Sequence, residues 1–165
     1  MRVMGIDPGS NRTGYGIVEA VGGSLKLLHC DTIQTSKKVT FPQKLKTIYD
    51  DLISAICQQR PNELAVEDIF FSINAKSALK LSQARGVILL AGANENLPIT
   101  EYSPLEVKQS IVGYGRADKN QVQAMVCRLL NIKSAPNTLD ASDALAIAIC
   151  HLHSSSIRKR IHALP

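Results

Sequence analysis

The order of strand-like and helix-like segments most constrains the fold of this chain. Three apolar runs come first, at residues 2–7, 13–19 and 24–34, and only short turns separate them. Strands joined by such turns pair as antiparallel hairpins. The rest of the chain alternates between helical and strand periodicity. This order predicts an α/β fold with a mixed five-stranded sheet, three antiparallel strands followed by parallel ones, and helices on both faces.

The later segments follow the same logic. Ser103-Pro104-Leu105-Glu106 combines a capping box with proline at the first helical position, so a helix begins there. Residues 84–93 are apolar almost all round, which is typical of a helix covered on more than one side. Asp118, with Gln121 three residues on, marks the start of another helix. The expected helices cover residues 42–59, 74–95, 104 onward, 118–131 and 140–153, and the two later strands cover 64–69 and 98–102.

Charged residues are unevenly distributed along the chain. The 165 residues include 19 Lys+Arg and 14 Asp+Glu, a formal net charge of +5. Basic residues occur between Asp31 and Asp50, and again between Asp68 and Glu95, with no acid in either stretch. The acids occur instead in small groups. This distribution permits an anionic partner such as nucleic acid, and the acidic groups require a separate explanation.

Local composition excludes several classes of protein. Asp7 interrupts the first apolar run before it reaches signal-peptide length, and no apolar run approaches the ~20 residues that cross a bilayer. The four cysteines are widely spaced, which favours buried thiols over a zinc site or disulfides. We expect a cytoplasmic protein with no membrane partner, built of one domain (1–153) and a basic, loosely ordered tail (154–165).

Two acids belong to predicted strands: one ends a strand and the other lies inside one. Asp7 ends the first run, directly before a Pro-Gly-Ser turn, where a carboxylate faces the crevice in which α/β sheets bind ligands. Alternatively, Asp7 only begins the turn. Glu67 lies inside the run 64–69, where an inward-facing acid needs a counter-charge or a metal; the alternative is a solvent-facing strand. Because Glu67 and Asp68 face opposite sides, at most one of them joins a shared site.

Asp140 and Asp143 begin the last predicted helix. An N-cap aspartate followed three residues later by an acid resembles a capping box, so helix capping alone explains both residues. The same spacing also places both carboxylates on one face of a helical turn. Taken singly, the pair favours capping.

The four acids predict a metal site if the fold brings them together. Asp7, Glu67, Asp140 and Asp143 would then place about four negative charges in one crevice, which cations must neutralise. Oxygen ligands without histidine or cysteine favour Mg²⁺, with Mn²⁺ as a substitute. Two such ions about 4 Å apart suit phosphodiester hydrolysis. A basic surface around an acidic metal pocket is typical of a nuclease.

Several motifs occur together in one order along the chain. They comprise residues 5–10 (GIDPGS), 13–16 (TGYG), 65–70 (AVEDIF), 74–86 (NAKSALKLSQARG), 107–109 (VKQ) and 139–148 (LDASDALAIA). Together they resemble the RuvC family of bacterial Holliday junction resolvases, from about residue 2 to residue 153. The Gly-Ile-Asp-x-Gly element alone is less specific, because actin-like ATPases share such a strand and turn.

The resemblance implies an RNase H-like fold and a homodimer. If residues 84–93 pack partly against the second subunit, the dimer explains why this helix lacks a polar face. It implies Mg²⁺-dependent nicking of two symmetrically placed strands of a four-way DNA junction, leaving 5′-phosphate and 3′-hydroxyl ends. RuvA and RuvB are the implied protein partners. The carboxylates that it identifies as catalytic and metal-binding are Asp7, Glu67, Asp140 and Asp143.

The resemblance also suggests DNA contacts. Lys108 and Lys119 match family lysines near the scissile strand, and Phe70 matches an aromatic that stacks on an unpaired junction base. For the phenylalanines the alternative is core packing, and for isolated basic residues it is a solvated surface. Further candidates are Phe71, Lys76, Arg85 and Arg116.

Two other functions stay open from sequence. An actin-like nucleotide-binding domain shares residues 5–9, although that architecture pairs two such domains and 165 residues are too few for it. A non-catalytic junction-binding module would use its acids only as caps. His151 and His153 match no required ligand, and we expect them to be solvated or to cap the helix end.

Overall fold

A computed structural model describes residues 1–68 and 75–162, with side chains up to residue 155. Phe70 and Phe71 lie outside the described residues. The elements, in chain order, are β1 (Arg2–Asp7), β2 (Arg12–Val21), β3 (Ser24–Gln34), α1 (Phe41–Gln59), β4 (Glu63–Glu67), α2 (Ala75–Asn94), β5 (Ile99–Tyr102), α3 (Pro104–Val112), α4 (Lys119–Leu129) and α5 (Leu139–His162).

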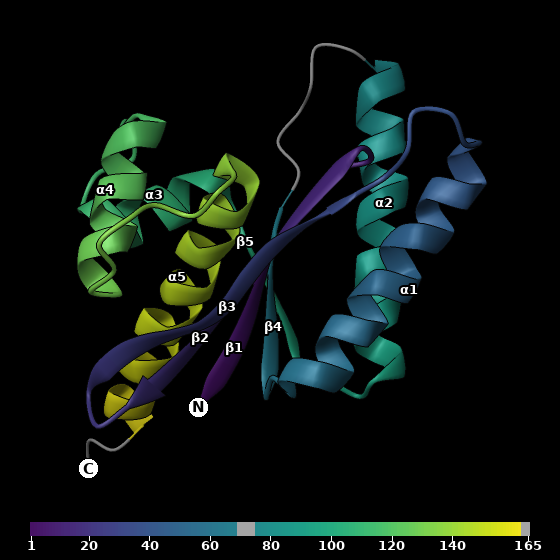
Figure 1. Ribbon diagram of the computed structural model, residues 1–165. Coiled ribbons are helices and arrows are strands. Elements are labelled where there is room, and N and C mark those ends of the chain that lie inside the picture. Colours follow the sequence, from purple (N-terminus) through teal and green to yellow (C-terminus); the bar gives the residue numbers. More distant parts are fainter. Residues whose placement is uncertain (69–74, 163–165) are drawn as a thin grey trace.

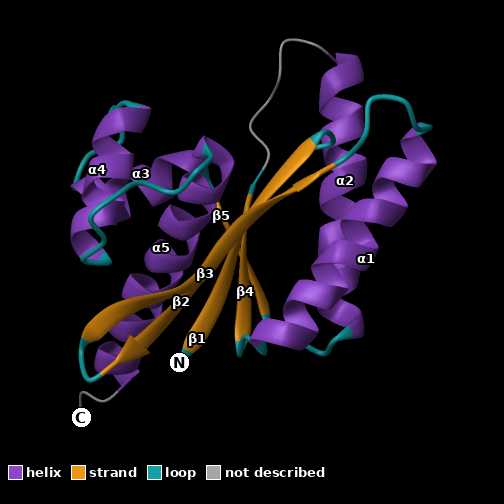
Figure 2. Ribbon diagram, in the orientation of Figure 1, coloured by secondary structure: helices purple, strands orange, loops and turns teal. Residues whose placement is uncertain are grey.

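The five strands form one sheet in the order β3-β2-β1-β4-β5. β2 pairs antiparallel with β1 and with β3, whereas β1 pairs parallel with β4 and β4 with β5. Helices α3, α4 and α5 cover one face of the sheet, and α1 and α2 cover the other (Figures 1 and 2). The predicted mixed sheet with helices on both faces is confirmed.

Alternating strand residues build two separate cores. Val3 and Ala65 belong to the core on the α5 side, whereas their neighbours Met4 and Val66 belong to the core beneath α1 and α2. All four side chains are fully buried. Gly5 allows α5 to lie directly on β1, since a β-carbon there would stand 2.1 Å from the carbonyl oxygen of Ala144. The sheet therefore positions α5 through backbone contact.

Local signals place the middle helices correctly. Ser103 Oγ accepts from the backbone N–H of Glu106 at 3.3 Å, and the Glu106 carboxylate accepts from the Ser103 N–H at 2.7 Å. The same reciprocal arrangement joins Asp118 and Gln121 at the start of α4. Both predicted capping boxes are confirmed because they depend only on residues within one turn.

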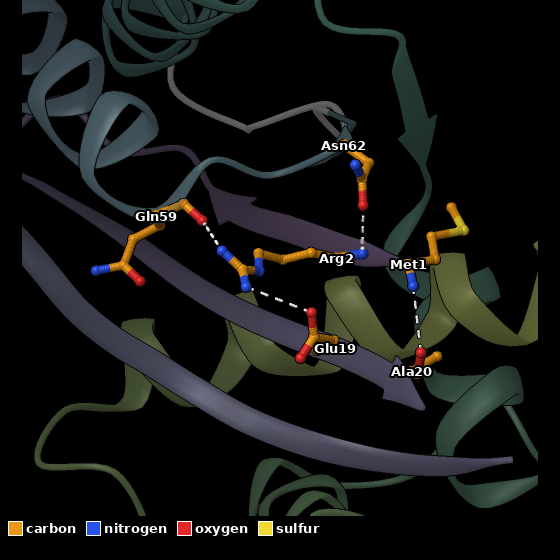
Figure 3. A network of polar contacts seen from close by, with 6 residues as sticks. All are labelled: Met1, Arg2, Glu19, Ala20, Gln59 and Asn62. Carbon is orange, nitrogen blue, oxygen red and sulfur yellow. Dashed lines mark hydrogen bonds and ion pairs between the residues drawn. The ribbon is translucent and has the colours of Figure 1, made fainter. Parts of the chain in front are cut away.

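Arg2 ties together the amino-terminal end of the sheet (Figure 3). Its backbone N–H donates to Oδ1 of Asn62 at 2.7 Å. Its guanidinium donates to the carbonyl oxygen of Gln59 and pairs with Glu19 at 3.4 Å. These contacts join β1, β2 and the end of α1. They lie at the amino-terminal end of β1, whereas Asp7 lies at its carboxyl end.

The ends of β4 and α5 differ from the prediction. β4 ends at Glu67, before the expected residue 69. α5 continues to His162, past the expected end near residue 153, so the backbone of residues 154–162 is helical. Among the helices of the described chain, none combines the length and the apolar character needed to cross a membrane.

His151 is also placed differently from the prediction. Its side chain is fully buried, whereas a solvated or capping position was expected. Nε2 lies 2.7 Å from Oε2 of Glu63, and Nδ1 lies 3.0 Å from the hydroxyl of Tyr102. The helix continues beyond His151, which keeps the imidazole in the core, where both ring nitrogens have partners.

Candidate active site

Carboxylates from two neighbouring strands lie together at the carboxyl ends of those strands. Asp7 is the last residue of β1 and Glu67 the last of β4, and these strands run parallel. Both side chains follow the alternation of Gly5 and Ala65, which face α5. They therefore point into the space between the sheet and the helices on that side. Asp68 faces the opposite side, as predicted.

A pocket of about 250 Å³ collects these acids. Asp143 reaches it from the first turns of α5, so three carboxylates from three elements share its wall. Lysines from α3 and α4 also line it, which places positive charge beside the acids. The lining residues are Asp7, Glu67, Asp143, Lys108, Lys119, Pro104, Val107, Val122 and Ala146.

Thr138, rather than Asp140, caps α5. Its Oγ1 accepts from the backbone N–H of Ala141 at 3.1 Å, and its carbonyl oxygen accepts from the N–H of Ser142 at 3.2 Å. Asp140 lies inside the first turn, so the prediction that it is the N-cap is wrong. The sequence signal was available, because Thr138 is itself a favoured cap residue. Capping therefore does not account for the acid pair.

Asp140 acts on the pocket from a distance. It does not line the pocket, but its charge adds to those of Glu67 and Asp143 in opposing ionisation of Asp7. Burial is the largest cause, and together these effects raise the pKa of Asp7 to about 8, against a weaker opposing effect of Lys119. Asp7 is therefore largely protonated at neutral pH in the protein alone.

Glu67 is coupled to Asp7. Burial, followed by the charge of Asp143, raises the pKa of Glu67, whereas Lys119, a hydrogen bond with Asp7 and Lys108 lower it. The pKa values of both acids are therefore raised, and burial is the largest cause for each. The pair thus carries less negative charge than two free carboxylates, because nothing in the pocket fully compensates both.

Lys119 supplies part of that compensation. Its Nζ donates to Oδ2 of Asp143 at 3.0 Å, and the Lys119 side chain is 67% exposed. The hydrogen bond and the charge of Asp143 raise the pKa of Lys119, with smaller contributions from Asp7 and Glu67. This lysine was predicted as a DNA contact, and no local sequence pattern indicated its pairing with Asp143.

The residues fit a divalent cation by donor chemistry. Carboxylate oxygens are the ligands that Mg²⁺ and Mn²⁺ prefer, and the raised pKa of Asp7 marks a buried acid whose charge lacks a full counter-charge. The acids are not preassembled around one point, however: within residues 1–68 and 75–162, no three acidic, histidine or cysteine side chains form a ready metal-binding group.

Arg85 was predicted to contact DNA, but it does not line the pocket. Its guanidinium pairs with Asp68 at 3.1 Å and with Glu101, and its side chain is only 18% exposed. These pairs link α2 to the ends of β4 and β5 on the far side of the sheet. Lys76 and Arg116 are exposed and do not line the pocket.

A family model described as crossover junction endodeoxyribonuclease RuvC matches residues 3–151 of this chain. The chain belongs to the RuvC family. RuvC of Pelobacter propionicus is 50% identical over 168 residues, covering 100% of this chain and 94% of the relative. RuvC of Koribacter versatilis is 50% identical over 166 residues, covering 99% of each chain.

Solved structures of other proteins support the same fold. Thermus thermophilus RuvC in complex with a Holliday junction substrate has a TM-score of 0.91 and 34% identity, covering 96% of each chain. The yeast mitochondrial Holliday junction resolvase has a TM-score of 0.72 at 12% identity, covering 96% of this chain and 80% of its own, and shows likeness of fold alone. The predicted RNase H-like fold of the RuvC resolvases is confirmed.

Proposed function

We propose that this chain is a metal-dependent endonuclease that resolves Holliday junctions. The observation that carries the proposal is the pocket at the edge of the sheet, where Asp7, Glu67 and Asp143 meet Lys108 and Lys119 in a member of the RuvC family. Acids that need a counter-charge, beside lysines suited to phosphate, are what phosphodiester hydrolysis requires. Helix capping does not explain Asp140, because Thr138 caps α5.

The four acids proposed to hold metal are Asp7, Glu67, Asp140 and Asp143. Mg²⁺ is the proposed ion, two per site, with Mn²⁺ able to replace it; such ions lower the pKa of a bound water and stabilise charge on the phosphoryl group. The carboxylates position this charge, and Lys108 and Lys119 attract and orient the phosphate backbone. Hydrolysis adds water across the P–O3′ bond, leaving a 5′-phosphate and a 3′-hydroxyl.

A homodimer is proposed because the described part of one chain has one such pocket and a junction must be cut twice. α2 supports this arrangement. Ala84 and Ile88 are buried in the chain's own core, whereas Leu79 is 66% and Leu90 54% exposed. A second copy placed on this apolar face would set two pockets on one symmetric particle, matching a four-way junction of nearly two-fold symmetry.

RuvA and RuvB remain the proposed protein partners, on the family resemblance alone. Because the proposed substrate arises from chromosomal DNA, the bacterial cytoplasm is the proposed site of action. The family assignment does not favour an actin-like nucleotide-binding domain.

The decisive experiment compares a synthetic four-way junction with a linear duplex of the same sequence. We expect the wild-type chain to cut the junction in Mg²⁺, to leave the duplex largely intact, and to be inactive in chelator. Asp7→Asn and Glu67→Gln should abolish cutting while keeping junction binding. Equal cutting of both substrates would contradict junction resolution, and wild-type cutting by either variant would contradict the catalytic assignment.

A non-catalytic junction-binding module makes a different prediction in the same assay. It would bind the junction selectively and cut it under no metal condition. The products distinguish the two functions directly, since symmetric nicks with ligatable ends arise only from the enzyme.

A further inference from the structure

A second hollow lies at the same end of the sheet as Asp7. Its volume is about 500 Å³. The loop between β1 and β2 and the segment that leaves β3 both lie at the upper end of the sheet in Figure 1, the end toward which β1 runs. The residues that line the hollow are all of polar or basic types: Asn11, Arg12, Gln34, Thr35, Ser36 and Lys37.

Two buried threonines hold the backbone of this hollow in place. Thr35 is 5% exposed; its N–H donates to the carbonyl oxygen of Asn11 at 3.0 Å, and its hydroxyl donates to that of Ser10 at 3.1 Å. Thr13 is fully buried and donates to the carbonyl oxygen of Gly9 at 2.8 Å. The loop that follows Asp7 is therefore fixed to β2 and β3, so the hollow is preorganised.

The positive charges around the hollow have no acidic partners. Lys44 reaches it from α1, where its Nζ donates to Oδ1 of Asn11 at 2.6 Å. Among the described side chains, no carboxylate lies within 4.0 Å of Arg12, Lys37 or Lys44, whereas Lys46 on the same helix pairs with Asp50. The sequence has no acid from residue 32 to residue 49 to neutralise them.

The hollow and the proposed active site lie at the same end of the sheet, although the two share no lining residue. Gly14 lies opposite Asp7 in the β1–β2 ladder, and Arg12 lies two residues beyond Gly14. Two strand residues span about 7 Å. Duplex DNA rises about 3.4 Å per base pair, so a strand with its scissile phosphate in the pocket comes within reach of Arg12 a few nucleotides away.

We infer that Arg12, Lys37 and Lys44 form a basic cradle that binds the phosphate backbone of a DNA arm leaving the active site. This inference rests on the proposed function and extends it. The described lining residues of the hollow include no aromatic group to stack on a base. Three cations from three segments suit phosphates, which position DNA without reading its sequence. Its contribution is to hold the arm so that the scissile phosphate stays in the pocket.

The test measures junction binding without cutting. In an Asp7→Asn background, the Kd for a fluorescent four-way junction is determined over a series of KCl concentrations for Arg12→Gln, Lys37→Gln, Lys44→Gln and the triple variant. Each lost phosphate contact should reduce the slope of log Kd against log [KCl] by about 0.9. We expect a reduction of about 2 to 3 for the triple variant.

Lys26→Gln is the matched control, because Lys26 is exposed on β3 at the end remote from the cradle. It removes the same charge and should leave the slope unchanged. Lys37→Arg with Lys44→Arg should also keep the wild-type slope, and thermal melting verifies that all variants fold. A triple variant with the same slope as Lys26→Gln would overturn the inference.

Two further measurements separate this inference from its premise. With Asp7 intact, the triple variant should need a higher protein concentration than the wild type to reach half of its maximal rate of cutting, because the DNA arm is held less tightly. If the wild type does not cut the junction, the proposed function is wrong. The salt dependence of junction binding still tests whether the cradle contacts phosphates. If the triple variant loses binding of inorganic phosphate but keeps the junction slope, the hollow is a small-anion site and the inference is wrong.

Discussion

Gly14 lies so close to Asp140 that a β-carbon on Gly14 would stand 2.0 Å from the carbonyl oxygen of Asp140. Gly14 is also the residue opposite Asp7 in the β1–β2 ladder. The absence of a side chain at this one position therefore determines how closely the acidic end of α5 approaches the acidic end of β1. The electrostatic coupling of Asp140 and Asp143 to Asp7 depends on this approach.

Gly14→Ala should separate the acids. The added methyl group meets backbone atoms of α5, which cannot rotate away, so the start of the helix must move outward. We expect a loss of about 1–3 kcal/mol in stability. Junction cutting should fall at least about tenfold, since misplacement of about 1 Å has such effects.

Gly16→Ala is the matched control for this substitution. It lies on the same strand and also meets α5, but it meets the flexible side chain of Leu145, farther from the pocket. It should lose stability yet keep its rate of cutting per folded molecule. Equal rates for the two variants would show that Gly14 does not set the site geometry.

Asp7→Asn should change how stability depends on pH. The pKa of Asp7 is about 8 in the folded protein and near 3.8 in the unfolded chain, so the folded state binds the extra proton between these values. The wild type must therefore lose stability as pH rises from about 4 to about 8. Asparagine imitates the protonated acid and avoids this loss.

The measurement is the melting temperature of both proteins in chelator from pH 4 to pH 9. We expect Asp7→Asn to be more stable at pH 9, by on the order of 3 kcal/mol, and the difference to vanish near pH 4. Mg²⁺ should reduce the difference at high pH by stabilising the ionised wild type. A difference that is constant with pH would contradict the raised pKa.

Substitutions at Thr138 and Asp140 should distinguish a helix-capping role from a metal-binding role. Thr138→Ala removes the cap of α5 and should cost about 0.5–2 kcal/mol, with cutting per folded molecule nearly unchanged. Asp140→Asn should melt close to the wild type and lose cutting by about a hundredfold if it holds metal. Wild-type cutting by Asp140→Asn would remove this residue from the proposed metal site.

Arg85→Met should affect the fold and leave DNA binding intact. The substitution removes the cation that pairs with Asp68 and Glu101. Because both carboxylates are about half exposed, we expect a cost of about 0.5–1 kcal/mol. Chemical denaturation measures this cost. The salt dependence of junction binding should stay at its wild-type slope, and a slope reduced by about 0.9 would restore Arg85 as a phosphate contact.

Leu90→Glu tests the proposed dimer. A charge on the exposed face of α2 should oppose association, and sedimentation should then show a monomer that remains folded. Leu105→Glu is the control, because Leu105 is 53% exposed, almost the same as Leu90 at 54%, but lies on α3. A dimer that survives Leu90→Glu unchanged would place the second copy elsewhere.

The sequence by itself determined the features that depend on neighbouring residues. Hydrophobic periodicity indicated the sheet, and the capping boxes at Ser103 and Asp118 indicated where α3 and α4 begin. Alternation along β4 correctly separated Glu67 from Asp68. These inferences succeeded because side-chain direction and capping act over a few residues, where chain connectivity alone brings the groups together.

Only the tertiary structure decided the partners of long-range charges. Arg85 pairs with Asp68 and Glu101, and Lys119 pairs with Asp143. His151 is buried against Glu63. These contacts join residues 16 to 88 positions apart. No local pattern encodes them, because they form only when packing of α5 and α2 on the sheet removes water and brings distant side chains within hydrogen-bond distance.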